Sequence, residues 1–300
     1  MIAATVPTPA APDAIPLTSP REHDREHDRE HDREHDHDHD REHDREHDHD
    51  HDREQPTNTQ SQVTNERNTP MATLADYGPE VRTEVKQVRE TVATLHEQLL
   101  TWNLVVWTAG NVSQRLRTAD LMVIKPSGVR YEYLTPGSMV VCDLDGNVVD
   151  GTEAPSSDTA SHAYIYRHMP EVYGVVHTHS TYATAWAATG QNIPCGLTMM
   201  GDEFGGPVPV GPFRLIGSEA IGEGVVETLK RYPKSPAVLM QNHGPFTIGK
   251  DGEGAVKAAA MTEEVAHTMW AARQLGDIIE IPQEDVDKLN DRYQNVYGQH

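Results

Sequence analysis

Two histidines, His177 and His179, stand one residue apart at the end of an apolar run. In an extended segment the side chains of residues i and i+2 project from the same face, so the two imidazoles converge. Zinc favours imidazole nitrogens, usually together with one or two further nitrogen or carboxylate ligands. The alternative is a polar strand end with two locally hydrogen-bonded histidines, and the pair alone does not decide between these interpretations.

Two further residues could complete a metal site. His243 follows another apolar run, and Asp158 follows two serines at the expected start of a helix. Three imidazoles and one carboxylate are typical of a catalytic zinc site. Each residue also has an ordinary explanation, a turn histidine for His243 and a helix N-cap for Asp158. Spacing alone does not bring the three segments together.

Three small polar turns offer backbone N–H groups and short side chains that can bind an anion. Each turn is a pair of neighbouring residues: Gly110 and Asn111, Ser127 and Gly128, and Ser156 and Ser157. None matches a nucleotide-binding fingerprint. Taken singly, each is more simply explained as an ordinary turn.

The elements that must position these residues are helices and short strands that alternate irregularly. Apolar residues three and four apart, from Val81 to Leu99, predict a helix that begins at Pro79. Several of the remaining segments predict strand pairs joined as hairpins. The expected fold is therefore α/β, a single domain whose mixed, largely antiparallel central sheet is flanked by helices. The expected strands are 104–107, 121–124, 139–144, 147–149, 172–176, 207–210, 213–216, 237–240 and 246–248, and the other expected helices are 160–169, 182–188, 219–230, 253–275 and 283–297.

The first 70 residues differ in composition from the rest of the chain. Residues 21–54 contain only Arg, Glu, His and Asp. A segment without apolar side chains gains too little from burial to offset its ordering entropy. We therefore expect residues 1–70 to be a disordered low-complexity tail and residues 71–300 to form the domain. Alternating His and Asp could bind metal weakly, but a solvated extension is the simpler interpretation.

Composition also excludes several classes of protein. Residues 21–54 contribute −10 of the net charge of −22, and the remaining −12 argues against a nucleic-acid partner held through phosphate contacts. No apolar run approaches the ~20 residues of a membrane span, and the N-terminus does not resemble a secretory signal. Only two cysteines occur, which argues against a fold held together by disulfide bonds. We expect a protein of the cytoplasm, with neither a membrane nor a nucleic acid as partner.

Eight ordered motifs together resemble the class II aldolase/epimerase (adducin-like) family, and within it the L-ribulose-5-phosphate 4-epimerases. They lie at 110–113, 125–129, 155–159, 176–180, 186–187, 193–194, 243–246 and 297–299. The resemblance covers about residues 80–299. It implies Zn²⁺, or another divalent metal, held by four ligands, with the three polar turns cradling the substrate and its phosphate. The implied ligands are Asp158, His177, His179 and His243.

The resemblance also implies a reaction. Its substrate would be a phosphorylated ketopentose, so that L-ribulose 5-phosphate and D-xylulose 5-phosphate interconvert through retro-aldol cleavage of C3–C4 and re-addition. This chemistry belongs to pentose and L-arabinose catabolism. Asp202 and Tyr297 fall where the epimerases have their catalytic aspartate and tyrosine. In the family these two residues would reach the site from a neighbouring subunit of a homotetramer.

Some residues depart from the epimerase pattern. Met200 precedes Asp202 by two residues in a segment where epimerases commonly carry a histidine, and Asn290 stands near the place of another histidine in some relatives. Class II aldolases share the zinc histidines, but a glutamate usually follows their paired serines. Asp158 at that position favours the epimerase. A sugar-phosphate aldolase, or a related dehydratase acting on another phosphorylated ketose, is the alternative.

Overall fold

The computed structural model describes residues 72–296, so the predicted tail lies outside the described residues. The strands are β1 (Asn111–Arg115), β2 (Leu121–Ile124), β3 (Val140–Asp143), β4 (Val148–Asp150), β5 (Gly174–His177), β6 (Val210–Gly211), β7 (Ala237–Met240) and β8 (Gly244–Gly249). The helices are α1 (Pro79–Thr101), α2 (Thr159–His168), α3 (Thr181–Thr189), α4 (Thr198–Phe204), α5 (Ala220–Arg231), α6 (Gly252–Leu275) and α7 (Gln283–Asn295). Three 3-10 turns, η1 (Leu74–Asp76), η2 (Tyr131–Tyr133) and η3 (Pro136–Ser138), complete the order.

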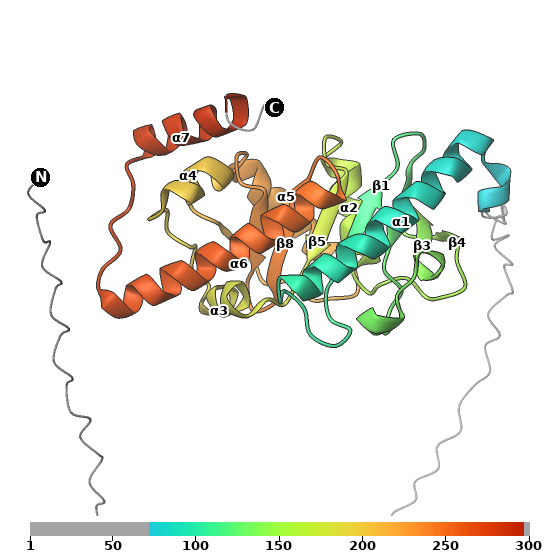
Figure 1. The fold of residues 1–300 in the computed structure, drawn as a ribbon, viewed down its shortest axis with the longest axis horizontal. Coiled ribbons are helices and arrows are strands. Elements are labelled where there is room, and N and C mark those ends of the chain that lie inside the picture. Colours follow the sequence, from blue (N-terminus) through green and yellow to red (C-terminus); the bar gives the residue numbers. More distant parts are fainter. Residues whose placement is uncertain (1–71, 297–300) are drawn as a thin grey trace, which may run out of the picture. The chain divides into compact units, whose positions relative to one another are not determined.

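The strands form one sheet in the order β4-β3-β2-β1-β5-β8-β7-β6 (Figure 1). Neighbouring strands are antiparallel, except that β6 and β7 run parallel. This confirms the predicted α/β fold with a mixed, largely antiparallel sheet. None of the described helices is long and apolar enough to cross a membrane.

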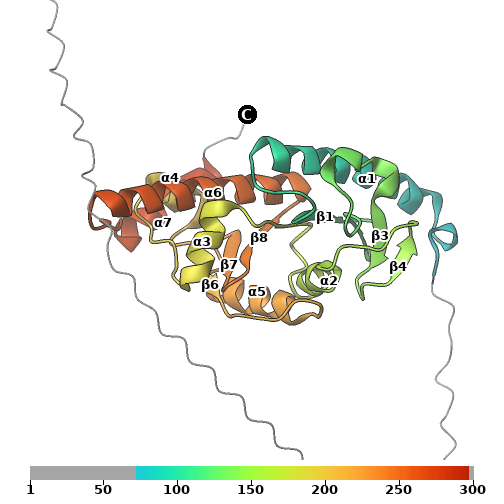
Figure 2. The same ribbon diagram turned by 90° about the horizontal axis from the view of Figure 1, so that it is seen from below.

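Helices cover both faces of the sheet, with α1 and α6 on one face and α2 and α5 on the other (Figure 2). Strand β2 shows why, because all four of its side chains are buried. Leu121 and Val123 pack with residues of α1, whereas Met122 and Ile124 pack with residues of α2 and α5. Alternate residues of a strand point to opposite faces, so a fully apolar strand requires helices on both sides.

Helix α1 follows from its sequence pattern. Pro79 occupies the first turn, where its missing N–H costs nothing. Val85, Val88 and Val92 lie on one face and are at most 4% exposed. Each buried side chain of this size contributes roughly 1.5–3 kcal/mol, so this face fixes the helix against the sheet. The prediction for this helix is confirmed.

The strand expected at 104–107 was wrong. Asn103 and Trp107 have φ angles of 55° and 61°, so the backbone turns on both sides of this apolar run. Leu104 and Val105 are buried, but Val106 is 75% exposed. The run therefore packs as a bend, and the first strand begins only at Asn111.

The strand expected at 213–216 was also wrong. These residues connect β6 to α5 without pairing in the sheet. Phe213, Leu215 and Ile216 are 52%, 72% and 58% exposed in the single chain. Their apolar side chains are therefore not buried against the sheet. Helix α4 (Thr198–Phe204), in contrast, was not expected at all, and it contains Asp202.

Candidate active site

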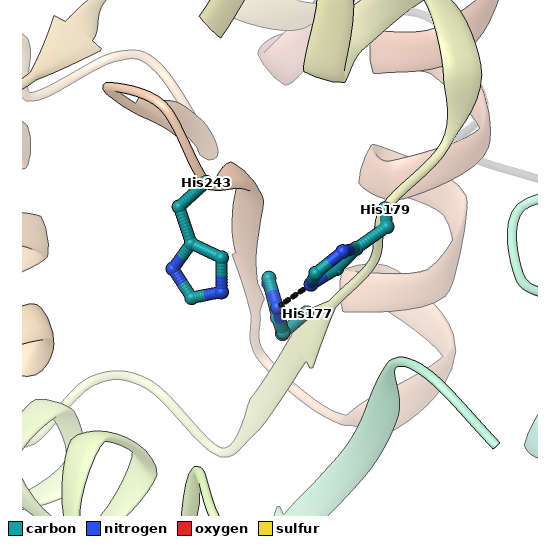
Figure 3. A group of neighbouring side chains, drawn as sticks. All are labelled: His177, His179 and His243. Carbon is teal, nitrogen blue, oxygen red and sulfur yellow. Dashed lines mark hydrogen bonds between the residues drawn. The ribbon is translucent and has the colours of Figure 1, made fainter. Parts of the chain in front are cut away.

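Three histidines lie together where strands β5 and β8 meet. β5 ends at His177, and β8 begins directly after His243. The two strands pair antiparallel, with His177 opposite Phe246, so the end of one strand adjoins the start of the other. His179, two residues beyond His177, turns its ring toward the same place (Figure 3). The sheet therefore brings together histidines that are far apart in the sequence.

The three imidazoles are close enough to share one metal ion. One ring nitrogen from each of His177, His179 and His243 lies within 4.8 Å of the others. The Nε2 atoms of His177 and His179 are 2.9 Å apart. Two ring nitrogens at this distance need a proton or a cation between them, because their lone pairs would otherwise repel. Such a set of donors fits zinc.

His177 is held in the form that a metal ligand requires. Its Nδ1 lies 3.0 Å from the carbonyl oxygen of Pro245. A carbonyl can only accept, so Nδ1 carries the proton and Nε2 keeps its lone pair. Burial lowers the pKa of His177 to about 3, and burial also lowers the pKa values of His179 and His243. The imidazoles are therefore neutral near pH 7, as metal binding requires.

Asp158, at the N-cap of α2, faces the same cavity. Asn111 donates through Nδ2 to Asp158 Oδ2 at 2.8 Å and to Ser156 Oγ at 3.0 Å. Burial raises the pKa of Asp158, but His177, His162 and the Asn111 hydrogen bond outweigh burial and lower it. Asp158 Oδ1 is buried and has no hydrogen-bond partner among residues 72–296. A charged carboxylate with one open oxygen suits a cation, although Asp158 is outside the 4.8 Å group of histidines.

The polar turns line one cavity together with the histidines and Asp158. This cavity has a volume of ≈ 340 Å³. Asn111 of β1 pairs with His177 of β5, which places the first turn beside the histidines. Gly110 has a φ of +78°, and a Cβ there would lie 2.9 Å from the carbonyl oxygen of His177, so glycine is required. All six predicted turn residues are in the lining: Gly110, Asn111, Ser127, Gly128, Ser156 and Ser157.

Lys125 also lines the cavity and was not among the predicted site residues. It directly follows β2 and is only 2% exposed. Its Nζ donates to the carbonyl oxygens of Thr108 and Pro126, both at 3.2 Å. Burial lowers the pKa of Lys125 to about 8. The signal in the sequence was a charged residue placed directly after a fully apolar strand.

Asp202 is not brought to the histidines within one chain. It lies on α4 and lines a different cavity, of ≈ 380 Å³, with Thr198, Leu289, Arg292 and Tyr293. Its backbone carbonyl accepts a hydrogen bond from Asn290. Tyr297, the other predicted catalytic residue, lies outside the described residues.

Two solved structures of similar fold illustrate the structural likeness. An L-fuculose 1-phosphate aldolase matches 69% of this chain and 96% of its own, at 25% identity and a TM-score of 0.66. YgbL from Klebsiella pneumoniae, described as a putative aldolase/epimerase/decarboxylase, matches 69% of this chain and 99% of its own, at 26% identity and a TM-score of 0.61.

Sequence relatives are more similar. L-ribulose-5-phosphate 4-epimerase UlaF from Salmonella paratyphi B and the protein of the same name from Salmonella typhi are each 42% identical over 199 residues. The match covers 63% of this chain and 86% of each relative. Residues 90–270 match the family model described as Class II Aldolase and Adducin N-terminal domain. With the cavity, its three histidines and the fold in agreement, the chain belongs to the class II aldolase and adducin family.

Proposed function

We propose that this protein is an isomerase, a zinc-dependent epimerase that interconverts L-ribulose 5-phosphate and D-xylulose 5-phosphate. One observation carries the proposal: three neutral imidazoles converge on a cavity that Asp158 and three polar turns also line. The choice of substrate is supported by relatives that are named L-ribulose-5-phosphate 4-epimerase and are 42% identical. The substrate pair belongs to pentose catabolism, including that of L-arabinose, and we assign the enzyme to the cytoplasm.

We assign Zn²⁺ to His177, His179, His243 and Asp158. The fit rests on the close approach of the His177 and His179 nitrogens and on the open, buried Oδ1 of Asp158. Another divalent metal with the same preference for nitrogen and oxygen would fit these donors. When bound, the metal supplies Lewis-acid stabilisation of the negative charge that develops on the ketose oxygens.

We assign substrate binding to the three polar turns. The hydroxyls of Ser127, Ser156 and Ser157 suit the phosphate oxygens, which accept hydrogen bonds. The backbone N–H groups of Gly128 and Ser157 also suit them, whereas those of Ser127 and Ser156 donate to backbone carbonyls. Gly110 and Asn111 suit the sugar hydroxyls beside the histidines, since they directly adjoin His177 in the sheet. The ≈ 340 Å³ cavity is large enough for a phosphorylated pentose. These residues hold the substrate while its C3–C4 bond breaks and re-forms.

C4 carries no acidic proton, so simple deprotonation cannot invert it, and we assign the reaction to cleavage of the C3–C4 bond. A base removes the proton of the C4 hydroxyl, and the C3–C4 electron pair moves toward C2, which gives an enediolate and glycolaldehyde phosphate. The aldehyde then rotates and accepts the enediolate carbon on its other face, and the new alkoxide takes up a proton. We assign these proton transfers to Asp202 and Tyr297, one on each face.

We propose that Asp202 and Tyr297 reach the histidines from a neighbouring subunit of a homotetramer. The position of Asp202 supports this arrangement, because it lines a cavity of its own chain that does not include the histidines. A site completed between subunits would bring the two cavities together. The catalytic unit would be residues 71–300, and deletion of residues 1–70 should leave turnover within about twofold, because a low-complexity segment supplies no fixed group to the site.

A class II sugar-phosphate aldolase is the second candidate. The observation in its favour is the similarity to an L-fuculose 1-phosphate aldolase over 96% of that chain. An aldolase would release the aldehyde instead of adding it back. Free aldehyde, in place of the epimeric ketose phosphate, is therefore the product that distinguishes the two.

The proposal is tested with the purified full-length protein and L-ribulose 5-phosphate. A coupled assay should detect D-xylulose 5-phosphate, and metal analysis of the same sample should find one zinc per subunit. Removal of the metal with a chelator should abolish turnover, and added zinc should restore it. Accumulation of free aldehyde without D-xylulose 5-phosphate would instead establish the aldolase, and full activity of the metal-free protein would contradict the assignment of the histidines.

A further inference from the structure

Helix α4, which carries Asp202, is fastened to α7 at close range. Asn290 of α7 is 7% exposed and donates through Nδ2 to the backbone carbonyl oxygen of Asp202 at 2.9 Å. One residue earlier on each helix, the side chain of Leu289 packs against Gly201, where an added Cβ would lie 2.8 Å from Leu289 Cδ1. The contact with Asn290 is therefore supported by close packing beside it.

A cluster of three side chains holds Glu203, the residue that follows Asp202 on α4. Glu203 of α4, Lys257 of α6 and Tyr293 of α7 meet, and the hydroxyl of Tyr293 donates to Glu203 Oε1. Lys257 Nζ lies 2.8 Å from Glu203 Oε1 and 2.5 Å from the Tyr293 hydroxyl. The Glu203 side chain is 14% exposed, so the ion pair is partly shielded from water. The cluster joins three helices at one point.

These contacts matter because α4 cannot hold its own shape. It has seven residues, fewer than an isolated helix needs in water, and a glycine at its centre lowers its helix propensity. The position of Asp202 therefore depends on what α4 is bound to. Helix α7 (Gln283–Asn295) is the element that supplies these attachments.

We propose that Asn290, supported by the Glu203–Lys257–Tyr293 cluster, is a positioning residue that sets Asp202 for proton transfer. The inference rests on the proposed function. Asn290 acts through the backbone of Asp202 and touches no group of the histidine cavity. Its loss should therefore change the rate of the chemical step and leave substrate binding and metal content as they are.

The test compares Asn290→Ala and Asn290→Asp with a matched control on the same helix. Asn290→Asp keeps the size of the side chain but removes the N–H donor, so it separates the hydrogen bond from packing. Lys288→Ala is the control, because the Lys288 side chain is 71% exposed and forms a local ion pair with Asp285 on the same helix. Both Asn290 variants should lower kcat by roughly 10–100-fold with KM within about threefold, as expected for a misplaced reacting group. Lys288→Ala should match the wild type.

A double variant distinguishes positioning from a general loss of structure. If Asn290 acts through Asp202, adding Asn290→Ala to Asp202→Asn should cause no further loss of kcat. Glu203→Gln should behave like Asn290→Ala in both backgrounds, with a smaller effect. Equal metal content and equal subunit assembly confirm that the variants are folded.

Three outcomes overturn the inference or its basis, and they are distinguishable. Unchanged kcat in both Asn290 variants, in an enzyme that Asp202→Asn inactivates, overturns the positioning role alone. An additive loss in the double variant shows that Asn290 acts elsewhere and also overturns it. A wild-type protein that does not epimerise L-ribulose 5-phosphate overturns the proposed function, and the positioning role with it.

Discussion

Two inactive variants, Asp202→Asn and His177→Ala, should recover activity when their subunits are mixed. His177 lines the ≈ 340 Å³ cavity, whereas Asp202 lines a different cavity of the same chain. If each site uses the histidines of one subunit and Asp202 of its neighbour, a mixed assembly contains some complete sites. Each variant alone contains none.

The size of the recovery follows from the arrangement of the subunits. In a cyclic tetramer every interface is head-to-tail, so each site draws on one chain for the histidines and on the next for Asp202. In an equal random mixture, half of the sites have intact histidines, and half of those have an intact Asp202 beside them. About one quarter of the sites, and hence about one quarter of wild-type activity, should return. Asp202→Asn alone should retain only about 10⁻²–10⁻⁴ of the rate, as expected on losing a general acid/base, so the gain is easily measured.

The measurement uses the two variants with different affinity tags, mixed by refolding and purified on both tags in sequence. A coupled assay with L-ribulose 5-phosphate then gives the rate per subunit. The control mixes wild type with the Asp202→Asn/His177→Ala double variant. Sites between subunits should again give about one quarter of the activity, whereas sites within one chain would give about one half. No recovery in mixed tetramers of the single variants would refute the shared site.

Three further predictions address the metal, the tyrosine and the fold. His177→Ala should lose most of its bound zinc and nearly all activity, because the remaining ligands bind metal at least about 100-fold more weakly; unchanged zinc content on metal analysis would exclude His177 as a ligand. Tyr297→Phe should lower epimerisation by roughly 10²–10⁴-fold with zinc content and assembly unchanged, and full activity would exclude the tyrosine from proton transfer. Burial lowers the pKa of His96 to about 3 from its usual 6.5, so the unfolded chain takes up a proton first as the pH falls, and stability is lost below pH 6.5. Between pH 7 and pH 5 this residue should cost about 2 kcal/mol of unfolding free energy. Urea denaturation at both pH values measures the unfolding free energy of wild type and of His96→Gln. Between pH 7 and pH 5 the variant should lose less unfolding free energy than the wild type, by that amount, and an equal loss in both would contradict the assignment.

Sequence reasoning predicted the fold best where burial is periodic. Helix α1 was visible because Val85, Val88 and Val92 repeat at helical spacing and are all buried. It failed where apolar residues are exposed, as at Val106 and Leu215, because hydropathy alone does not tell a strand from a bend or a surface loop. Helix α4 was missed for a different reason, since its contacts with α7 come from a segment almost 90 residues later.

The histidine cluster could be predicted in its parts but not as a whole. His177 and His179 converge by the geometry of one extended segment, which spacing alone reveals. His243 joins them only because β5 pairs with β8, a long-range contact that no local pattern encodes. The resemblance to a family supplied that contact in advance, and the structure gives its physical origin. Lys125 could have been found by the same rule as His177, since both are polar residues at the end of a buried strand.

The proposed role of Asp202 cannot be explained by the structure of one chain alone. Its motif supplied a role, yet in the folded chain it lines a cavity without the histidines and is held by Asn290 of α7. The attachment to α7 does not bring Asp202 to the histidines of the same chain. It is, however, what a proton-transfer residue requires when it acts in the site of another subunit. Catalysis across an interface demands that the reacting group be fixed before the subunits meet, because no contact of the site itself orients it. The fastening of α4 and the separation of the two cavities are thus two consequences of one proposed arrangement. The subunit-mixing experiment tests the separation, and the Asn290 variants test the fastening.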